Sequence, residues 1–187
     1  MHSFIRIVGV YGDGFMASHL TLKNIAVIVD KYAVAVDSAS SFSVFYRCEF
    51  KAQKGALLAR GYYQLYRKCK IQGASDLVFG NAHTILQRDA IYSNASLYWG
   101  VPLGPFAKIV IMQSLLEVRG TWSYAPYTPS TVFYGQHNNS RPGAVDGIMS
   151  PYVNTLERNQ ASEYTVRDFL NGETWLSPDM PHDLDLL

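Results

Sequence analysis

The chain has 187 residues, of which 48% are hydrophobic and 17% are charged, and its formal net charge is +1. This length suits a single domain with a sizeable core, and the nearly balanced charge argues against a nucleic-acid partner. Residues 1–11 are apolar but short and contain Arg6. We therefore expect neither a signal peptide nor a membrane span there.

Taken in order, the chain alternates short apolar strands with turns. We expect strands within 19–29, 32–36, 43–50, 65–71, 84–92, 108–118 and 131–134. Near the end, Thr165 and Asp168 fit a helix capping box, with Phe169 and Leu170 facing the body and Gly172 as the C-cap. Residues 1–11 and 179–187 are expected to be poorly ordered.

The strands belong to a repeat of 20 to 25 residues. Its anchor column holds a small or polar residue in each repeat: Asn24, Cys48, Cys69, Asp89 and Ser114. Two residues later comes an apolar column, Ala26, Phe50, Ile71, Ile91 and Leu116. Four residues earlier comes another, Leu20, Val44, Leu65, Ile85 and Val110. One residue earlier comes a polar column, Lys23, Arg47, Lys68, Arg88 and Gln113.

Such a repeat, with one dominant strand signal and no helix between strands, indicates a solenoid. We predict an all-β parallel β-helix in which residues 1–187 form one domain. The column of Leu20, Val44, Leu65, Ile85 and Val110 should then stack in adjacent parallel strands of one sheet, with the side chains pointing inward.

The chemical inventory is short. The five histidines show no metal-ligand spacing, so we expect no metal and no cofactor. Cys48 and Cys69 share a column one coil apart, which allows either a disulfide or two stacked buried thiols. Asn94 and Asn138 begin glycosylation sequons.

One carboxylate lies in an unusual place. Asp76 stands between the turn at 72–75 and the apolar run 77–79. A turn aspartate often only accepts hydrogen bonds from backbone amides. Its place ahead of a buried strand also allows a chemical role, and both interpretations stay open on this stretch alone.

Longer stretches resemble a known family. Residues 71–82 (IQGASDLVFGNA) resemble the nucleophile signature of plant pectin methylesterases (pectinesterases). Further matches follow in the family's order at 12–15, 44–48, 65–69, 110–114, 133–135, 142–144 and 169–176. The resemblance implies a right-handed parallel β-helix and an extracellular, cell-wall location. It also implies hydrolysis of the methyl esters of galacturonate units in pectin, with pectin as the partner.

The resemblance also assigns site residues. Asp76 matches the family's nucleophile. Gly55, or Lys54 if one residue is inserted, takes the place of a second aspartate that serves as acid and base, and with that insertion Gln53 would be an oxyanion donor. The other matched positions are a glutamine replaced by Tyr32, an arginine replaced by Val101, a groove aromatic replaced by Leu103 and a groove tryptophan retained at Trp122.

These departures make the chain a degenerate member of the family that starts after the family's first coils. We therefore consider two functions for the chain: a pectinesterase with impaired activity, and an inactive pectin-binding remnant. An open first coil also predicts self-association through the end that bears Met1–Val10.

Overall fold

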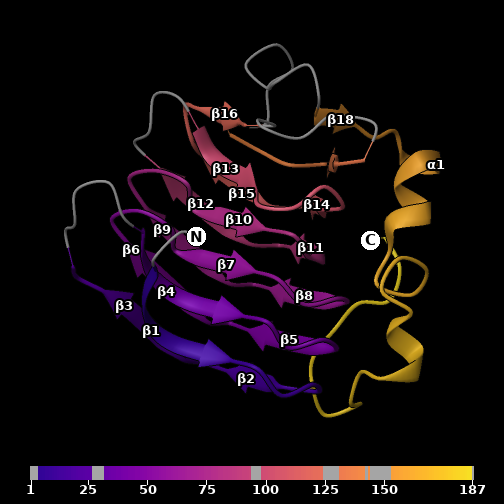
Figure 1. The fold of residues 1–187 in the computed structure, drawn as a ribbon. Coiled ribbons are helices and arrows are strands. Elements are labelled where there is room, and N and C mark those ends of the chain that lie inside the picture. The colour runs from indigo at the N-terminus through magenta and orange to yellow at the C-terminus, as the bar shows by residue number, and fades with distance from the viewer. Residues whose placement is uncertain are drawn as a thin grey trace.

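The computed structural model describes residues 4–26, 32–93, 98–123, 131–141, 143 and 153–186. These residues form a right-handed parallel β-helix, in which the chain winds repeatedly past three sheets (Figure 1). Each full coil contributes one strand to each sheet, and all of the strand pairs are parallel. The predicted fold class is confirmed.

Sheet A has six strands in the order β1-β4-β7-β10-β13-β16. These are β1 (Phe4–Val10), β4 (Tyr32–Ser38), β7 (Leu57–Ala59), β10 (Val78–Gly80), β13 (Tyr98–Pro102) and β16 (Thr121–Trp122). Sheet B runs from β2 (Met16–Ser18) through β5 (Ser43–Tyr46), β8 (Gln64–Arg67), β11 (His83–Gln87), β14 (Lys108–Met112) and β17 (Phe133–His137) to β18 (Val153–Thr155). Sheet C stacks β3 (Thr21–Asn24), β6 (Glu49–Ala52), β9 (Lys70–Gly73), β12 (Ala90–Ser93) and β15 (Leu115–Glu117).

A sharp corner follows six strands of sheet B (β2, β5, β8, β11, β14 and β17), and the first five corners lead into a strand of sheet C. One residue at every corner has a left-handed backbone, with φ between 50° and 58°: His19, Arg47, Lys68, Arg88, Gln113 and Asn138. The corner N–H donates to the coil above, as from Lys68 to the Gln87 carbonyl at 3.0 Å. From Arg47 onward, the polar column of the sequence is therefore a column of corners.

The first coil lies four residues away from its expected register. Thr21 pairs with Glu49, so Leu20 aligns with Cys48, and His19, not Lys23, aligns with Arg47 at the corner. Met16, not Leu20, pairs with Val44, and Leu20 is 46% exposed. The prediction for Leu20 is wrong, because the first repeat is 28 residues long, as between Met16 and Val44, and not 20 to 25 as expected.

The remaining four members of that column stack as predicted, but they point outward. Val44, Leu65, Ile85 and Val110 lie side by side in sheet B. They pack against residues of the C-terminal segment, whereas their neighbours Phe45 and Tyr66 fill the interior. The corner accounts for this, because a left-handed residue resets which side chains face inward in the next strand.

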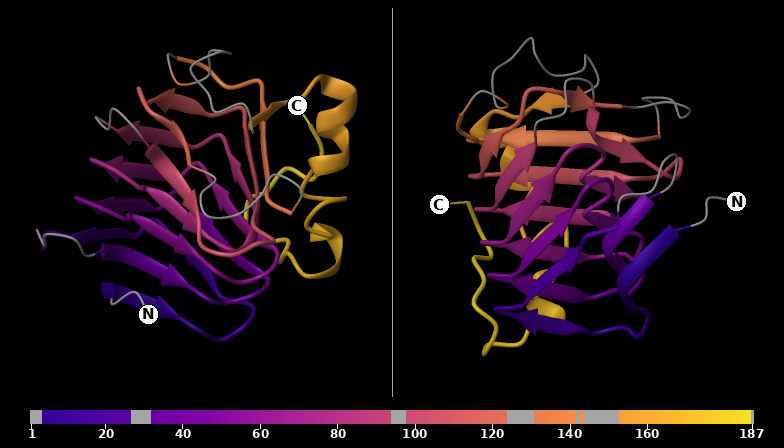
Figure 2. Two further views of the ribbon diagram at one scale, coloured as in Figure 1. Left: turned by 45° about the horizontal axis from the view of Figure 1, so that its top comes forward. Right: turned by 90° about the vertical axis from the view of Figure 1, so that its left-hand side faces the viewer.

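The C-terminal segment, residues 156–186, covers the outer side of sheet B (Figures 1 and 2). It contains α1 (Arg158–Ala161), the 3-10 turn Ser162–Tyr164 and the 3-10 turn Gly172–Thr174. A short C-terminal helix is thus confirmed, but it precedes the predicted position. Thr165 and Asp168 do contact each other at 2.8 Å, within a series of turns rather than in a helix.

Both chain ends make more structure than the sequence suggests. Residues Phe4–Val10 form β1, which pairs with β4 along its length. At the other end, Met180, Leu184 and Leu186 pack on the outer side of sheet B, and Asp183 forms an ion pair with the buried Arg67. The described residues at both ends thus contact the body of the fold, and the expectation that residues 1–11 and 179–187 are poorly ordered stays a prediction.

Candidate active site

Three polar side chains meet at the N-terminal ends of neighbouring strands of sheet A. Tyr32 begins β4, Lys54 precedes β7 and Asp76 precedes β10. Lys54 forms a parallel bridge with Ser75, and the Gly55 N–H donates to the Ser75 carbonyl at 3.2 Å. Gly55 therefore lies beside Asp76 in the neighbouring coil, as their shared offset of seven residues from Cys48 and Cys69 predicts.

The Asp76 carboxylate is held by two donors. Its side chain is 14% exposed, and Lys54 Nζ lies 3.6 Å from Oδ2. The Tyr32 hydroxyl donates a second hydrogen bond to it. Burial raises the pKa of Asp76 above its ordinary value, and the Lys54 charge with both hydrogen bonds opposes that rise.

Tyr32 is fixed on several sides. Its ring stacks on Phe79 with centroids 4.7 Å apart, and Lys54 Nζ lies 4.8 Å from its centroid. Burial, followed by the negative charge of Asp76, raises the pKa of Tyr32 to about 12. The phenol is therefore protonated at neutral pH and acts as a hydrogen-bond donor to Asp76.

Gly55 has no room for a side chain here. Its φ is +85°, and a Cβ atom would lie 2.9 Å from ring atoms of both Tyr32 and Phe79. A contact that close forces a neighbour to move. The position that resembles the family's second aspartate is thus filled by the ring of Tyr32, and the site contains one carboxylate and one ammonium group.

An apolar surface continues from this site across the outer face of sheet A. Val34, Leu58 and Phe79 are buried there and form a cluster separate from the interior, with Val101 and Leu103 packed against it. Val101 pairs with Phe79 in the register. The structure therefore brings Val101 and Leu103 near Tyr32, through Phe79.

Trp122 lies elsewhere. It is 2% exposed, belongs to the interior cluster and stacks on Tyr134 with centroids 4.4 Å apart. This placement corrects the expectation that Trp122 lines a groove together with Asp76, because its side chain lies in the interior.

Gln53 is exposed and points to a different surface. It lines an open depression of about 400 Å³ beside sheet C, together with Gln72 and Tyr92. Asp76 is not among the residues that line this depression. The structure thus brings Lys54, but not Gln53, to the carboxylate.

The two cysteines are free and buried. They stack one coil apart, and the Cys69 thiol donates to the Phe45 carbonyl at 3.2 Å. Of the two alternatives for this pair, the structure contains stacked thiols rather than a disulfide. Asn138 is an exposed corner residue, open to modification, whereas Asn94 lies outside the described residues.

The sequence did not show that Lys54 and Tyr32 contact Asp76 directly. The register of the coils indicates this contact, because it places Lys54 beside Ser75 and therefore next to Asp76. Within the described ranges, no group of three or more His, Cys, Asp or Glu residues could hold a metal ion. The same part of the chain contains no helix with the length and apolar character needed to cross a bilayer.

Comparisons with known proteins agree on one family. The family model described as Pectinesterase matches residues 5–97. Probable pectinesterase/pectinesterase inhibitor 17 of Arabidopsis thaliana is 28% identical over 224 residues, which cover 93% of this chain and 44% of the relative. Pectinesterase 3 of Phaseolus vulgaris is 31% identical over 215 residues, which cover 89% of this chain and 37% of the relative.

Solved structures show the same fold. The pectin methylesterase from carrot superposes with a TM-score of 0.76 at 23% identity, covering 97% of this chain and 73% of that one. The pectin methylesterase from Aspergillus niger gives a TM-score of 0.69 at 20% identity, covering 94% of this chain and 70% of that one. The chain spans less than half the length of the two curated relatives named above.

Proposed function

We propose, given that the chain belongs to the pectinesterase family, that it acts weakly on the methyl esters of galacturonate units in pectin. Asp76 is the nucleophile in this proposal. The observation that carries it is the partly exposed Asp76 carboxylate at the matched position, fixed by Lys54 and Tyr32. Its place of action is the plant cell wall, where pectin is found.

The proposed reaction proceeds in two steps. An Asp76 oxygen attacks the ester carbonyl, the bond to the methoxy oxygen breaks, and the methoxide takes a proton from solvent water and leaves as methanol. A second water then attacks the resulting anhydride and gives its protons to solvent, which frees the galacturonate carboxylate and regenerates the Asp76 carboxylate. The Lys54 ammonium, beside the carboxylate, stabilises the oxyanion that develops in each attack.

The same arrangement explains why turnover is slow. The position beside Asp76 is Gly55, so that position offers no carboxyl group to donate a proton to the leaving methoxide. General acid help is typically worth about 10²- to 10⁴-fold in rate. Lys54 and Tyr32 also stabilise the charged form of Asp76, which reduces its tendency to attack.

A methanol-release assay on methyl-esterified pectin tests this function. We expect slow release by the chain and none by Asp76→Asn, whereas Asp179→Asn, an exposed acid in the C-terminal segment, releases methanol at the original rate. Release that survives in Asp76→Asn would refute the assignment of the nucleophile.

The second function is binding without hydrolysis. The Lys54–Asp76 ion pair and the absence of a carboxylate at Gly55 both favour it. In that case the chain releases no methanol, yet it binds pectin in a sedimentation assay with insoluble pectin.

A further inference from the structure

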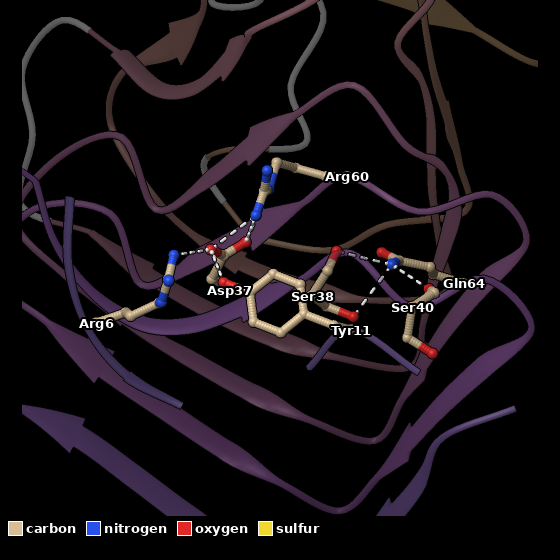
Figure 3. A network of polar contacts seen from close by, with 7 residues as sticks. All are labelled: Arg6, Tyr11, Asp37, Ser38, Ser40, Arg60 and Gln64. Carbon is tan, nitrogen blue, oxygen red and sulfur yellow. Dashed lines mark hydrogen bonds and ion pairs between the residues drawn. The ribbon is translucent and has the colours of Figure 1, made fainter. Parts of the chain in front are cut away.

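A second charged cluster lies on the same sheet as Asp76, at the opposite ends of its strands. Asp37 at the end of β4 accepts from Arg6 Nη1 of β1 at 2.8 Å and from Arg60 Nε and Nη2, just after β7, at 2.8 and 2.9 Å (Figure 3). The Tyr11 hydroxyl lies 3.5 Å from Asp37 Oδ2. Side chains from three successive coils therefore meet around one carboxylate.

The cluster has more positive charge than the buried acid requires. The Asp37 side chain is fully buried, and the fork of Arg60 alone reaches both of its oxygens. Arg6 adds a second guanidinium, so the group has one net positive charge. The side chains of Arg6 and Arg60 are 44% and 42% exposed, so this charge is presented to solvent.

An exposed aromatic ring completes the surface. Tyr11 is 55% exposed, and the guanidinium carbon of Arg6 lies 5.3 Å from its ring centroid. A guanidinium beside an aromatic ring offers fork-shaped donors for a carboxylate and an apolar face for a sugar ring.

Buried hydrogen bonds hold the backbone next to Asp37 and Arg60 in place. The Arg60 N–H donates to the Ser38 carbonyl at 2.8 Å. Gln64 Nε2 donates to the Ser38 carbonyl and hydroxyl and to the Ser40 carbonyl, at 2.8 to 3.1 Å (Figure 3). The turn that follows Asp37 is therefore rigid, and the guanidinium groups are positioned before any ligand arrives.

The cluster and Asp76 share one face. Asp37 pairs with Leu58, and Leu58 pairs with Phe79 on the outer side of sheet A. Arg60 follows Gly55 by five residues, and Gly55 lies beside Asp76. At about 3.3 Å per residue, about 16 Å separates the two sites, a span of several sugar units.

We propose that Arg6, Arg60 and Tyr11 form a binding site for a free carboxylate of a galacturonate oligomer. The choice of a uronide as ligand rests on the proposed function, whereas the site itself rests on the cluster. The protein then prefers pectin that is already partly de-esterified, with a free carboxylate at the arginines while a methyl ester lies at Asp76.

Calorimetric titration with a galacturonate hexamer and with its fully methyl-esterified counterpart tests the site. We expect the free acid to bind more tightly, with an affinity that falls as salt is added. Arg60→Gln should weaken that binding about tenfold, the usual size for one lost charge-assisted hydrogen bond. Arg158→Gln, an exposed arginine on α1, is the matched control and leaves the affinity unchanged.

Two further variants guard against misfolding, because removal of Arg60 leaves Asp37 buried with fewer partners. Asp37→Asn keeps both arginines and raises the net charge of the cluster, so the free acid should bind at least as tightly. Arg6→Gln/Asp37→Asn/Arg60→Gln removes every charge at once and should lose the preference for the free acid. The melting temperature of each variant confirms that it is folded.

Equal affinity for acid and ester, or loss of binding in Asp37→Asn, would overturn the site. Methanol release separates this result from the proposed function. A chain that binds the free acid through Arg60 but releases no methanol has the site without the reaction. A chain that releases methanol through Asp76 but binds acid and ester equally has the reaction without the site.

Discussion

At the scale of single residues, the surroundings of Asp76 decide its chemistry. A carboxylate that must attack an ester needs a partner that donates a proton at the right moment. Here its two contacts are an ammonium and a phenol, and both favour the charged, hydrogen-bonded state. The ring of Tyr32 occupies the space beside Gly55 in which another carboxyl group would have to lie.

This crowding predicts how activity can be restored. Gly55→Asp alone should gain no methanol release and should lose stability, because its Cβ would lie 2.9 Å from the rings of Tyr32 and Phe79. Tyr32→Gln/Gly55→Asp removes the ring that stacks on Phe79, so that Phe79 can shift to admit the new side chain, and should raise the rate about tenfold or more. Adding Val101→Arg should raise it further. Tyr32→Gln alone is the control, and a Gly55→Asp variant as active as the triple variant would contradict the prediction.

A buried acid far from this site predicts a dependence of stability on pH. Burial raises the pKa of Asp89 well above its ordinary value, and the Cys69 N–H and the Arg67 charge oppose the rise only in part. The unfolded chain therefore releases this proton first as pH increases. The stabilising contribution of Asp89 is complete below about pH 4 and is lost as pH rises toward the raised pKa.

Asp89→Asn removes this titration. Because Asp89 Oδ2 has no hydrogen-bond partner within the described part of the chain, we expect the variant to be more stable by about 1 to 3 kcal/mol at pH 7. The gain should shrink toward pH 4. Urea unfolding at both pH values measures it, with Asp179→Asn as an exposed control. A gain that is equal at both pH values would show that ionisation of Asp89 is not its cause.

At the scale of elements, the corners between sheets B and C control the architecture. Each corner residue has a positive φ, a conformation that costs a non-glycine residue about 1 to 2 kcal/mol. Each of the six corners has this cost, and each is retained because the turn keeps successive coils in register. The polar, unbranched side chains at these positions tolerate the conformation better than β-branched ones.

The corner at Lys68 gives a direct test. Lys68→Asn should keep or slightly raise stability, whereas Lys68→Val should lower it by about 1 to 2 kcal/mol, because a β-branched side chain clashes at positive φ. The same two changes at Lys23, on the exposed face of β3, are the control. There valine should be preferred over asparagine. Unfolding midpoints in urea rank the four variants, and the same order at both positions would argue against corner strain.

At the scale of the whole molecule, each sheet of described strands ends in two edge strands. β1 lies at the end of sheet A and pairs with β4 alone among the described strands. Ile5 and Ile7 on this strand are 47% and 53% exposed. An edge strand with free backbone groups and exposed apolar side chains is a template for pairing with another chain.

We therefore expect the protein to self-associate through β1. Light scattering should show a mass that increases with concentration, and Ile7→Lys should shift the population toward the monomer, because a charged edge strand resists pairing. Arg158→Glu, an exposed position on α1 in the C-terminal segment, makes a charge change away from β1 and serves as the control. A monodisperse monomer at high concentration would rule out this association.

The sequence by itself determined the parallel β-helix and located Asp76. Both follow from spacing along the chain: strands that recur every 20 to 25 residues must stack, and the apolar columns fix their order. Equal offsets from Cys48 and Cys69 also placed Gly55 beside Asp76. These are consequences of register, which a repeat records directly in the positions of its residues.

Only the tertiary structure decided which faces are covered and which side chains meet. The corners reset inward and outward facing, so Val44 and its column lie beneath the C-terminal segment instead of in the interior. The repeat spacing placed Asn24 beside Cys48 in the first coil, whereas backbone pairing places Thr21 beside Glu49. The meeting of Arg6, Asp37 and Arg60 joins residues from three coils at no common offset. Such contacts depend on how side chains pack in space, and spacing along the chain does not record that.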